Sequence, residues 1–240
     1  MCTVSFIPKG NTFVFTSNRD EHISRPSAFF PKKEIVNNKR IVFPKDPKAG
    51  GTWFAISESG AVVILLNGAF EKHVPKDNYA KSRGLVVLDI VSHNNPQDYL
   101  KEIDLIKIEP FTVLVFEKEK LVELRWDGKN KHLKTLKSDQ AYIWSSATLY
   151  DKEIIQKREE LFSSFMNKAE VDAKSIIDFH SNNHQDSQNG FIIDRQTGLK
   201  TFSVTQAVLE KRRVALKHID LLKQETNKLE MITSQLISQF

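Results

Sequence analysis

The chain has 240 residues, of which 40% are hydrophobic and 27% are charged, and its formal net charge is +5. This composition excludes a disordered chain and is typical of a folded protein, so we expect a single domain over residues 1–240. The basic residues lie in short scattered clusters without a nucleic-acid-binding motif, and we therefore expect no nucleic-acid partner.

The single cysteine excludes an internal disulfide, and no cluster of cysteine and histidine residues predicts a bound metal. The longest apolar run, residues 61–66, is too short to cross a bilayer. No basic region followed by an apolar core marks a signal peptide. We therefore expect a cytoplasmic protein without a transmembrane segment, and nothing in the sequence predicts a cofactor.

The first predicted element is a hairpin. Residues 3–7 and 12–17 are rich in β-branched and aromatic residues, and they flank the turn sequence Pro-Lys-Gly-Asn. In an antiparallel pair folded about this turn, the numbers of paired residues add up to about 20. We therefore expect Cys2 to lie opposite Asn18, with Arg19 and Asp20 just beyond.

The next segments predict a loop and a second hairpin. Residues 21–31 contain two prolines and few strand signals, so we expect an irregular loop there. Residues 41–44 predict a short strand, and residues 50–57 and 61–66 predict a hairpin that ends at Asn67-Gly68. Its second strand is apolar at every position, which indicates a central strand covered on both faces.

The remaining segments alternate between helices and strands. Apolar residues at helical spacing predict a helix over residues 151–166, residues 171–179 predict a second one, and the N-cap pair Asn95-Pro96 predicts a helix over residues 97–103. We also expect a helix over residues 85–91, despite their β-branched residues, because a helical stretch follows. Strands are predicted over residues 111–116, 121–126, 132–136, 141–144, 191–194, 201–210, 214–221 and 229–232. No parallel βαβ repeat is present. This order predicts an α+β fold, which a four-layer αββα sandwich of antiparallel sheets satisfies.

Cys2 is the first candidate for chemistry. Removal of Met1, which is usual when the second residue is small, would make Cys2 the first residue. Its α-amine, with an ordinary pKa of about 7.7–8.0, could then accept the thiol proton. The thiolate could attack an amide carbonyl and form an acyl-enzyme. The alternative is a small buried apolar residue, which is how free cysteines usually behave.

The residues after the second predicted strand are polar. Asp20 could hold the ammonium group in place, and Arg19 could lower the pKa of the thiol or bind a substrate carboxylate. Asn18 could fix the backbone or contribute to an oxyanion site. An ordinary polar loop is the alternative for all three. Asn67 suits an oxyanion donor at a strand end, with a turn-forming role before Gly68 as the alternative.

Four further residues are candidates for contact with a substrate. Trp53 is expected in the core or in the lining of a pocket. His73, Tyr79 and Arg83 lie in a polar run after the second hairpin, and each alone is an ordinary surface residue.

Several motifs together resemble the NRDE family, also called the transport and Golgi organisation protein 2 family. These motifs are Met1-Cys2, Asn18-Arg19-Asp20-Glu21, Gly50-Gly51-Thr52-Trp53, Asn67-Gly68, Ser82-Arg83-Gly84 and residues 144–150. The resemblance extends over nearly the whole chain and implies an αββα fold like that of N-terminal-nucleophile hydrolases.

Choloylglycine hydrolases and penicillin V acylases are similar in beginning with Met-Cys and carrying an Arg-Asn-x-Asp motif. Aligned on Asn-x-Asp, Asp20 matches the aspartate that contacts the nucleophile in those enzymes. Ser17 falls where they have arginine, and Arg19 falls at their variable position.

The resemblance implies an N-terminal cysteine hydrolase that acts on a non-peptide or acyl amide C–N bond of a small molecule. The eukaryotic branch of the family is linked to lipid, acyl-CoA and haem handling. The alternative is therefore a non-catalytic protein that binds acyl-CoA, another lipid or haem on the same fold.

Overall fold

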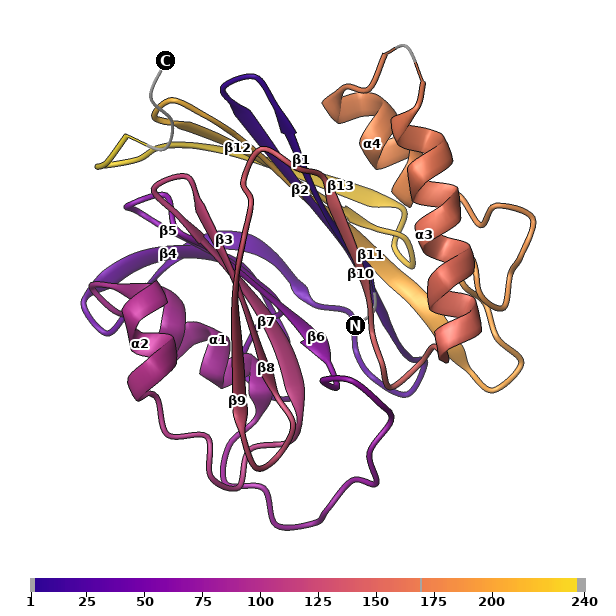
Figure 1. The fold of residues 1–240 in the computed structure, drawn as a ribbon, viewed down its shortest axis with the longest axis horizontal. Helices are drawn as coiled ribbons and strands as arrows, with labels where there is room; N and C mark the ends of the chain where they lie inside the picture. The colour runs from indigo at the N-terminus through magenta and orange to yellow at the C-terminus, as the bar shows by residue number, and fades with distance from the viewer. Residues whose placement is uncertain (1–2, 169, 237–240) are drawn as a thin grey trace.

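The structure is a computed structural model that describes residues 3–168 and 170–236. The described residues form two antiparallel sheets stacked face to face, with helices on both outer sides (Figure 1). The predicted α+β fold with four αββα layers is therefore confirmed. No helix in the described part of the chain has the length and apolarity needed to cross a membrane.

The first sheet has six strands in the order β10-β1-β2-β11-β12-β13. They are β10 (Tyr142–Ser145), β1 (Thr3–Lys9), β2 (Thr12–His22), β11 (Leu199–Glu210), β12 (Arg213–Asp220) and β13 (Glu225–Ile232). The second sheet has seven strands in the order β3-β4-β5-β6-β7-β8-β9. They are β3 (Phe29–Val36), β4 (Lys39–Lys45), β5 (Phe54–Ser57), β6 (Val62–Asn67), β7 (Phe111–Glu117), β8 (Lys120–Trp126) and β9 (Lys131–Leu136).

Each of the four predicted helices is present. The helices α1 (Arg83–Ser92) and α2 (Pro96–Glu102) cover the seven-stranded sheet, and α3 (Lys152–Met166) and α4 (Ala173–His180) cover the six-stranded sheet. Side-chain caps explain their starts, because α1, α3 and α4 each begin after a Ser or Asp that accepts a backbone N–H. In α2, Pro96 occupies the first turn, where no N–H is needed.

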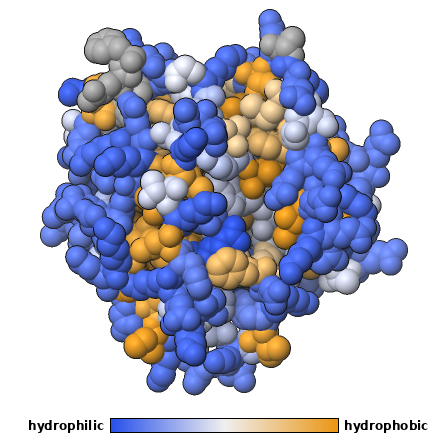
Figure 2. Space-filling model, in the orientation of Figure 1, coloured by the Kyte–Doolittle hydropathy of each residue, from blue (hydrophilic) through white to orange (hydrophobic). Residues whose placement is uncertain are grey.

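Strand alternation in β1 separates two regions of the core. Val4 and Phe6 face the second sheet, and the Phe6 ring lies 5.8 Å from that of Phe116 in β7. Ile7 instead packs toward α3 and α4, in a cluster that includes Phe162. Figure 2 shows one face of the molecule, on which hydrophobic residues are seen mainly toward the middle and hydrophilic residues along the edges.

The register of the first hairpin differs from the prediction by one residue. Thr3, not Cys2, pairs with Asn18, and the ladder runs on to Lys9 opposite Thr12. The reason is the turn, which contains only Gly10 and the residue after it, with Gly10 in the left-handed region at φ +57°. Two-residue turns of this kind match the twist of the strands they join.

Residues 21–31 do not form one irregular loop. The strand β2 continues to His22, and β3 begins at Phe29, so the prediction missed an edge strand. Pro31 lies within β3, next to an irregularity in its pairing with β4. A proline is tolerated at a sheet edge because its missing N–H needs no partner there.

Two other strand predictions were inaccurate. Residues 191–194 form no strand in the described structure, only an isolated bridge between Asp194 and Lys200. The last strand is longer than predicted, because β13 already begins at Glu225. Its polar first half pairs with β12 at the edge of the sheet, where side chains need not be apolar.

Candidate functional site

A cleft of about 470 Å³ lies where the ends of β2, β4 and β6 meet the start of α1. It brings together five of the residues predicted from the sequence. These are Arg19, Trp53, Asn67, Tyr79 and Arg83. They come from widely separated elements, so the fold alone brings them together.

Arg19 lies at the base of this cleft with only 1% of its surface exposed. Its Nη2 donates to Oδ2 of Asp46 at 2.7 Å, and its guanidinium stacks 4.7 Å from the ring centre of Trp53. Burial lowers the pKa of Arg19, although Glu21 and Asp46 oppose this effect. Arginine remains protonated in proteins, so the group is a buried cation held by an aromatic ring and a carboxylate.

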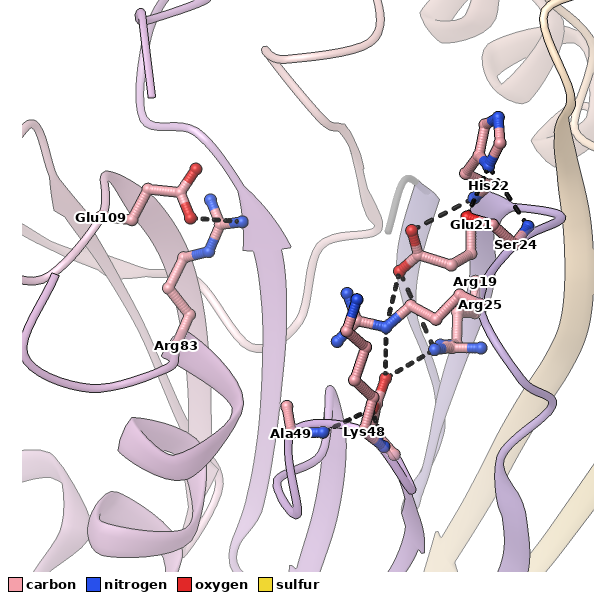
Figure 3. A network of polar contacts seen from close by, with 10 residues as sticks. Arg19, Glu21, His22, Ser24, Arg25, Lys48, Ala49, Arg83 and Glu109 are labelled. Atoms are coloured by element: carbon pink, nitrogen blue, oxygen red, sulfur yellow. Dashed lines mark hydrogen bonds and ion pairs between the residues drawn. The ribbon is translucent and has the colours of Figure 1, made fainter. Parts of the chain in front are cut away.

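Asp46 is the common acceptor of a polar network, whose donors Arg19, Arg25, Lys48 and Ala49 are labelled in Figure 3. Its Oδ2 accepts hydrogen bonds from Arg19 and from Nε of Arg25, and its Oδ1 accepts the N–H groups of Lys48 and Ala49. Burial raises the pKa of Asp46, but the Ala49 N–H and the Arg25 guanidinium outweigh burial and hold that pKa below its ordinary value. Sequence reasoning missed Asp46, because nothing in its local pattern distinguishes it from a turn residue.

Arg83 and Glu109 lie apart from the Asp46 network (Figure 3). Their side chains form an ion pair at 2.9 Å, and Oε1 of Glu109 lies 3.0 Å from Nε2 of His73. Burial lowers the pKa of Arg83, and Glu109 opposes this effect. His73 thus reaches the cleft through Glu109, whereas Tyr79 lines it directly and accepts the N–H of Lys76.

Asn18 lies on the opposite face of β2 from Arg19. Its Nδ2 donates to the carbonyl oxygens of His180 and Phe191 at 2.9 and 2.8 Å, and its Oδ1 lies 2.5 Å from Nδ1 of His180. The other ring nitrogen of His180 contacts Ser5 at 2.7 Å. Asn18 therefore joins β2 to the end of α4, consistent with the expected role in fixing the backbone.

Asp20 is buried at the end of β2 and has ordered hydroxyl partners. Its Oδ1 accepts a hydrogen bond from Thr201 at 2.6 Å, and its Oδ2 accepts one from Tyr150 at 3.1 Å. Cys2 lies outside the described residues, and β1 begins at Thr3, opposite Asn18. Tyr150 ends one of the motifs noted in the sequence, but its contact with Asp20 was not foreseen.

Arg158, in α3, is a second buried arginine and was not among the candidate residues. Its Nη1 donates to the carbonyl oxygens of Asn189 and Gly190 at 2.8 Å, and its Nη2 contacts the Thr3 hydroxyl. Its guanidinium also lies 4.1 Å from the ring centre of Tyr150. A basic residue at an apolar helical position was the signal for a buried role.

Asn67 ends β6 beside the cleft, as predicted. Its Oδ1 is buried and has no hydrogen-bond partner among residues 3–168 and 170–236, and the same holds for the indole Nε1 of Trp53. Unpaired buried polar atoms at a cleft are typical of groups that a ligand satisfies. Within the described residues, no group of three or more His, Cys, Asp or Glu side chains could hold a metal ion.

Solved structures with a similar fold include proteins named as an acylase, a hydrolase and an amidase. Penicillin V acylase from Agrobacterium tumefaciens aligns with a TM-score of 0.56 and 9% identity, over 96% of this chain and 86% of its own. A conjugated bile acid hydrolase from Clostridium perfringens aligns with a TM-score of 0.53 and 12% identity, over 98% of both chains. An N-acylethanolamine-hydrolyzing acid amidase ortholog from Caenorhabditis elegans aligns with a TM-score of 0.59 and 12% identity, over 85% of this chain and 92% of its own.

At these identities the similarity concerns the fold, which is that of an N-terminal-nucleophile hydrolase-like sandwich. A search of curated proteins found no match. The family model described as Transport and Golgi organisation 2 matches residues 1–227, almost the whole chain. The chain therefore belongs to the transport and Golgi organisation 2 family.

Proposed function

We propose that the protein is an N-terminal cysteine hydrolase that cleaves an acyl amide C–N bond of a small molecule. The observation that carries this proposal is the buried carboxylate of Asp20, oriented by the hydroxyls of Tyr150 and Thr201. It lies in β2 next to Arg19, which lines the cleft, and β2 pairs with the first described strand of the chain. The names of the similar structures are consistent with this class of reaction.

In the proposed reaction, Met1 has been removed and the α-amine of Cys2 accepts the thiol proton. The thiolate attacks the carbonyl carbon, a C–S bond forms, and the carbonyl oxygen becomes an oxyanion. Collapse of this intermediate breaks the C–N bond, and the leaving amine takes the proton from the α-ammonium. Water then hydrolyses the thioester, which releases a carboxylic acid and restores the thiol.

In this proposal, two residues assist the reaction steps. Asp20 accepts a hydrogen bond from the α-ammonium, because a carboxylate can accept about four hydrogen bonds. Asn67 donates its side-chain amide to the oxyanion from the end of β6. Arg19 and Trp53 form the base of the cleft against which the substrate packs.

The test combines intact-mass measurement with trapping of an acyl-enzyme. The native protein should lack Met1 and should gain one acyl group on Cys2 when incubated with a panel of acyl aminocoumarins. The Cys2→Ala variant should show neither the adduct nor release of the fluorescent amine. Tyr150→Phe, which removes one hydrogen bond to Asp20, should slow acylation about tenfold while the adduct remains on Cys2.

Retention of Met1 on the native protein would overturn the proposal, and so would hydrolysis that survives in Cys2→Ala. A protein with a free Cys2 that binds acyl-CoA, another lipid or haem without turnover, and still binds as Cys2→Ala, would favour the non-catalytic alternative.

A further inference from the structure

Two arginines line the cleft from different elements of the fold. Arg25 comes from the segment after β2, and Arg83 is the first residue of α1. In Figure 3, the guanidinium of Arg25 points toward the side of the cleft where Arg83 lies. Burial is the main cause that lowers the pKa of Arg83, Glu109 opposes it, and the charge of Arg25 is a smaller cause that lowers it further.

The carboxylates of the cleft are already engaged. Asp46 accepts bonds from two arginines and two backbone N–H groups. Glu21 lies 3.6 Å from Arg25 and 3.8 Å from Arg19 and also accepts the His22 N–H, and Glu109 contacts both His73 and Arg83. Each of these acids is paired with at least one arginine of the cleft, so none of them is an uncompensated negative charge.

Hydrogen-bond donors, in contrast, remain available. Arg25 is 31% exposed and bonds through Nε, so its two terminal nitrogens contact no acceptor among the described residues. The buried indole N–H of Trp53 also lacks a partner within residues 3–168 and 170–236. A cleft with engaged acids and unpaired donors is complementary to an acceptor that carries negative charge.

The start of α1 adds to this complementarity. Ser82, Arg83 and Gly84 line the cleft, and the first turn of α1 contains no acidic residue. The Ser82 hydroxyl caps the N–H of Leu85, whereas the N–H groups of Arg83 and Gly84 come too early in the helix to have an intrahelical acceptor. Helix N-termini of this kind favour anions.

We infer that the cleft binds an anionic group of the substrate, a carboxylate or a phosphate, between Arg25 on one wall and the start of α1 on the other. The inference rests on the proposed function only in taking the ligand to be the substrate of Cys2. It narrows the substrate class to amides that carry an acidic group near the scissile bond.

The test measures binding to the full chain carrying Cys2→Ala, so that no turnover is required. Three probes share one acyl amide: N-acetylethanolamine is neutral, N-acetylglycine carries a carboxylate, and O-phospho-N-acetylethanolamine carries a phosphate. At low salt, at least one anionic probe should bind about tenfold more tightly than the neutral probe, and this advantage should shrink as salt is raised. The stronger of the two anionic probes identifies the acidic group.

Two variants in the cleft and one control variant outside it locate the site. Arg25→Gln should remove most of the advantage of the anionic probe and leave the neutral probe unchanged. Arg213→Gln, a matched change at an exposed ion pair with Glu230, should affect neither. Trp53→Phe keeps an aromatic ring at this position but removes the indole N–H, and it should weaken binding of the anionic probe several-fold.

Equal affinities for neutral and anionic probes would overturn the inference, as would an anionic advantage that Arg25→Gln leaves intact. These outcomes are independent of the hydrolase proposal, because they concern a variant that cannot form an acyl-enzyme. If the native protein bound the anionic probe but formed no acyl-enzyme, the proposed anion site would stand and the proposed hydrolase reaction would be wrong.

Discussion

Asn18 and Arg19 are consecutive residues of β2, yet their side chains leave the strand on opposite faces. Asn18 bonds to the end of α4 through His180, while Arg19 bonds to Asp46 across the two sheets. Neighbouring residues of a strand alternate in this way. The two residues therefore join different layers of the sandwich, and substitutions at each should have different consequences.

We expect Asn18→Ala to destabilise the protein by about 3 kcal/mol, because it leaves two buried carbonyl oxygens and a ring nitrogen of His180 without their partner. Urea unfolding monitored by circular dichroism measures this loss. Asn130→Ala, in an exposed turn, should change the free energy of unfolding by less than about 0.5 kcal/mol. A loss below about 1 kcal/mol for Asn18→Ala would contradict a structural role of this size.

Asp46→Asn should also destabilise the protein by about 3 kcal/mol, because Arg19 would stay buried and charged without its nearest carboxylate. The same change at Asp178, which forms an exposed ion pair with Lys174, should have a far smaller effect. The double variant that combines Arg19→Met with Asp46→Asn should lose less free energy of unfolding than the sum of the losses in the two single variants. Additive losses in this cycle, measured in urea, would argue against coupling between the two side chains.

Stability should fall on acidification below pH 6.5. Burial lowers the pKa of His180 to about 3 and that of His218 to about 4, whereas both have a pKa of about 6.5 in the unfolded chain. Between the folded and unfolded values, the unfolded chain binds more protons, so the free energy of unfolding decreases by up to about 1.4 kcal/mol per pH unit for each histidine.

Urea unfolding at pH 7, 6 and 5 measures this slope. His218→Gln preserves a hydrogen-bonding group beside Thr205 and should flatten the slope between pH 6 and 5. The exposed His93→Gln should leave it unchanged. An identical slope in the His218 variant and the native protein would exclude His218 as a cause of the acid sensitivity.

Gly51→Ala should disturb the contact between β5 and α1. A Cβ at Gly51 would lie 2.3 Å from the backbone carbonyl carbon of Gly84. Because this is a backbone atom and not the end of a flexible side chain, the chain itself would have to shift. We expect the free energy of unfolding to fall by about 3 kcal/mol. Ligand binding in the cleft should also weaken, because Gly51 and Gly84 both line it. Gly10→Ala, with no atom nearby but a φ of +57°, should cost only about 1 kcal/mol. Thermal unfolding measures both losses.

Much of the secondary structure could be predicted because its signals are local. The apolar run of β6, the helical spacing of apolar residues in α3 and the Asn95-Pro96 pair before α2 act over a few positions, and the elements predicted from them are present. The edge strand β3 was missed because its alternation is weak and it contains Pro31, which sequence rules assign to loops. The register of the first hairpin was missed by one residue because it depends on the length of the turn.

The residue pattern alone was sufficient for the family, the α+β class and the proximity of Asn18, Arg19 and Asp20 to the start of the chain, because motifs and hairpins are properties of short segments. Which face of β2 each side chain occupies, and what it contacts there, depends on how distant segments pack. Arg19 donates a hydrogen bond to Asp46, which is 27 positions away in the sequence. Asn18 donates one to His180, which is 162 positions away. Alternation along a strand sets the order of the faces, but the stacking of the sheets and helices decides which face becomes the cleft and which becomes the structural core.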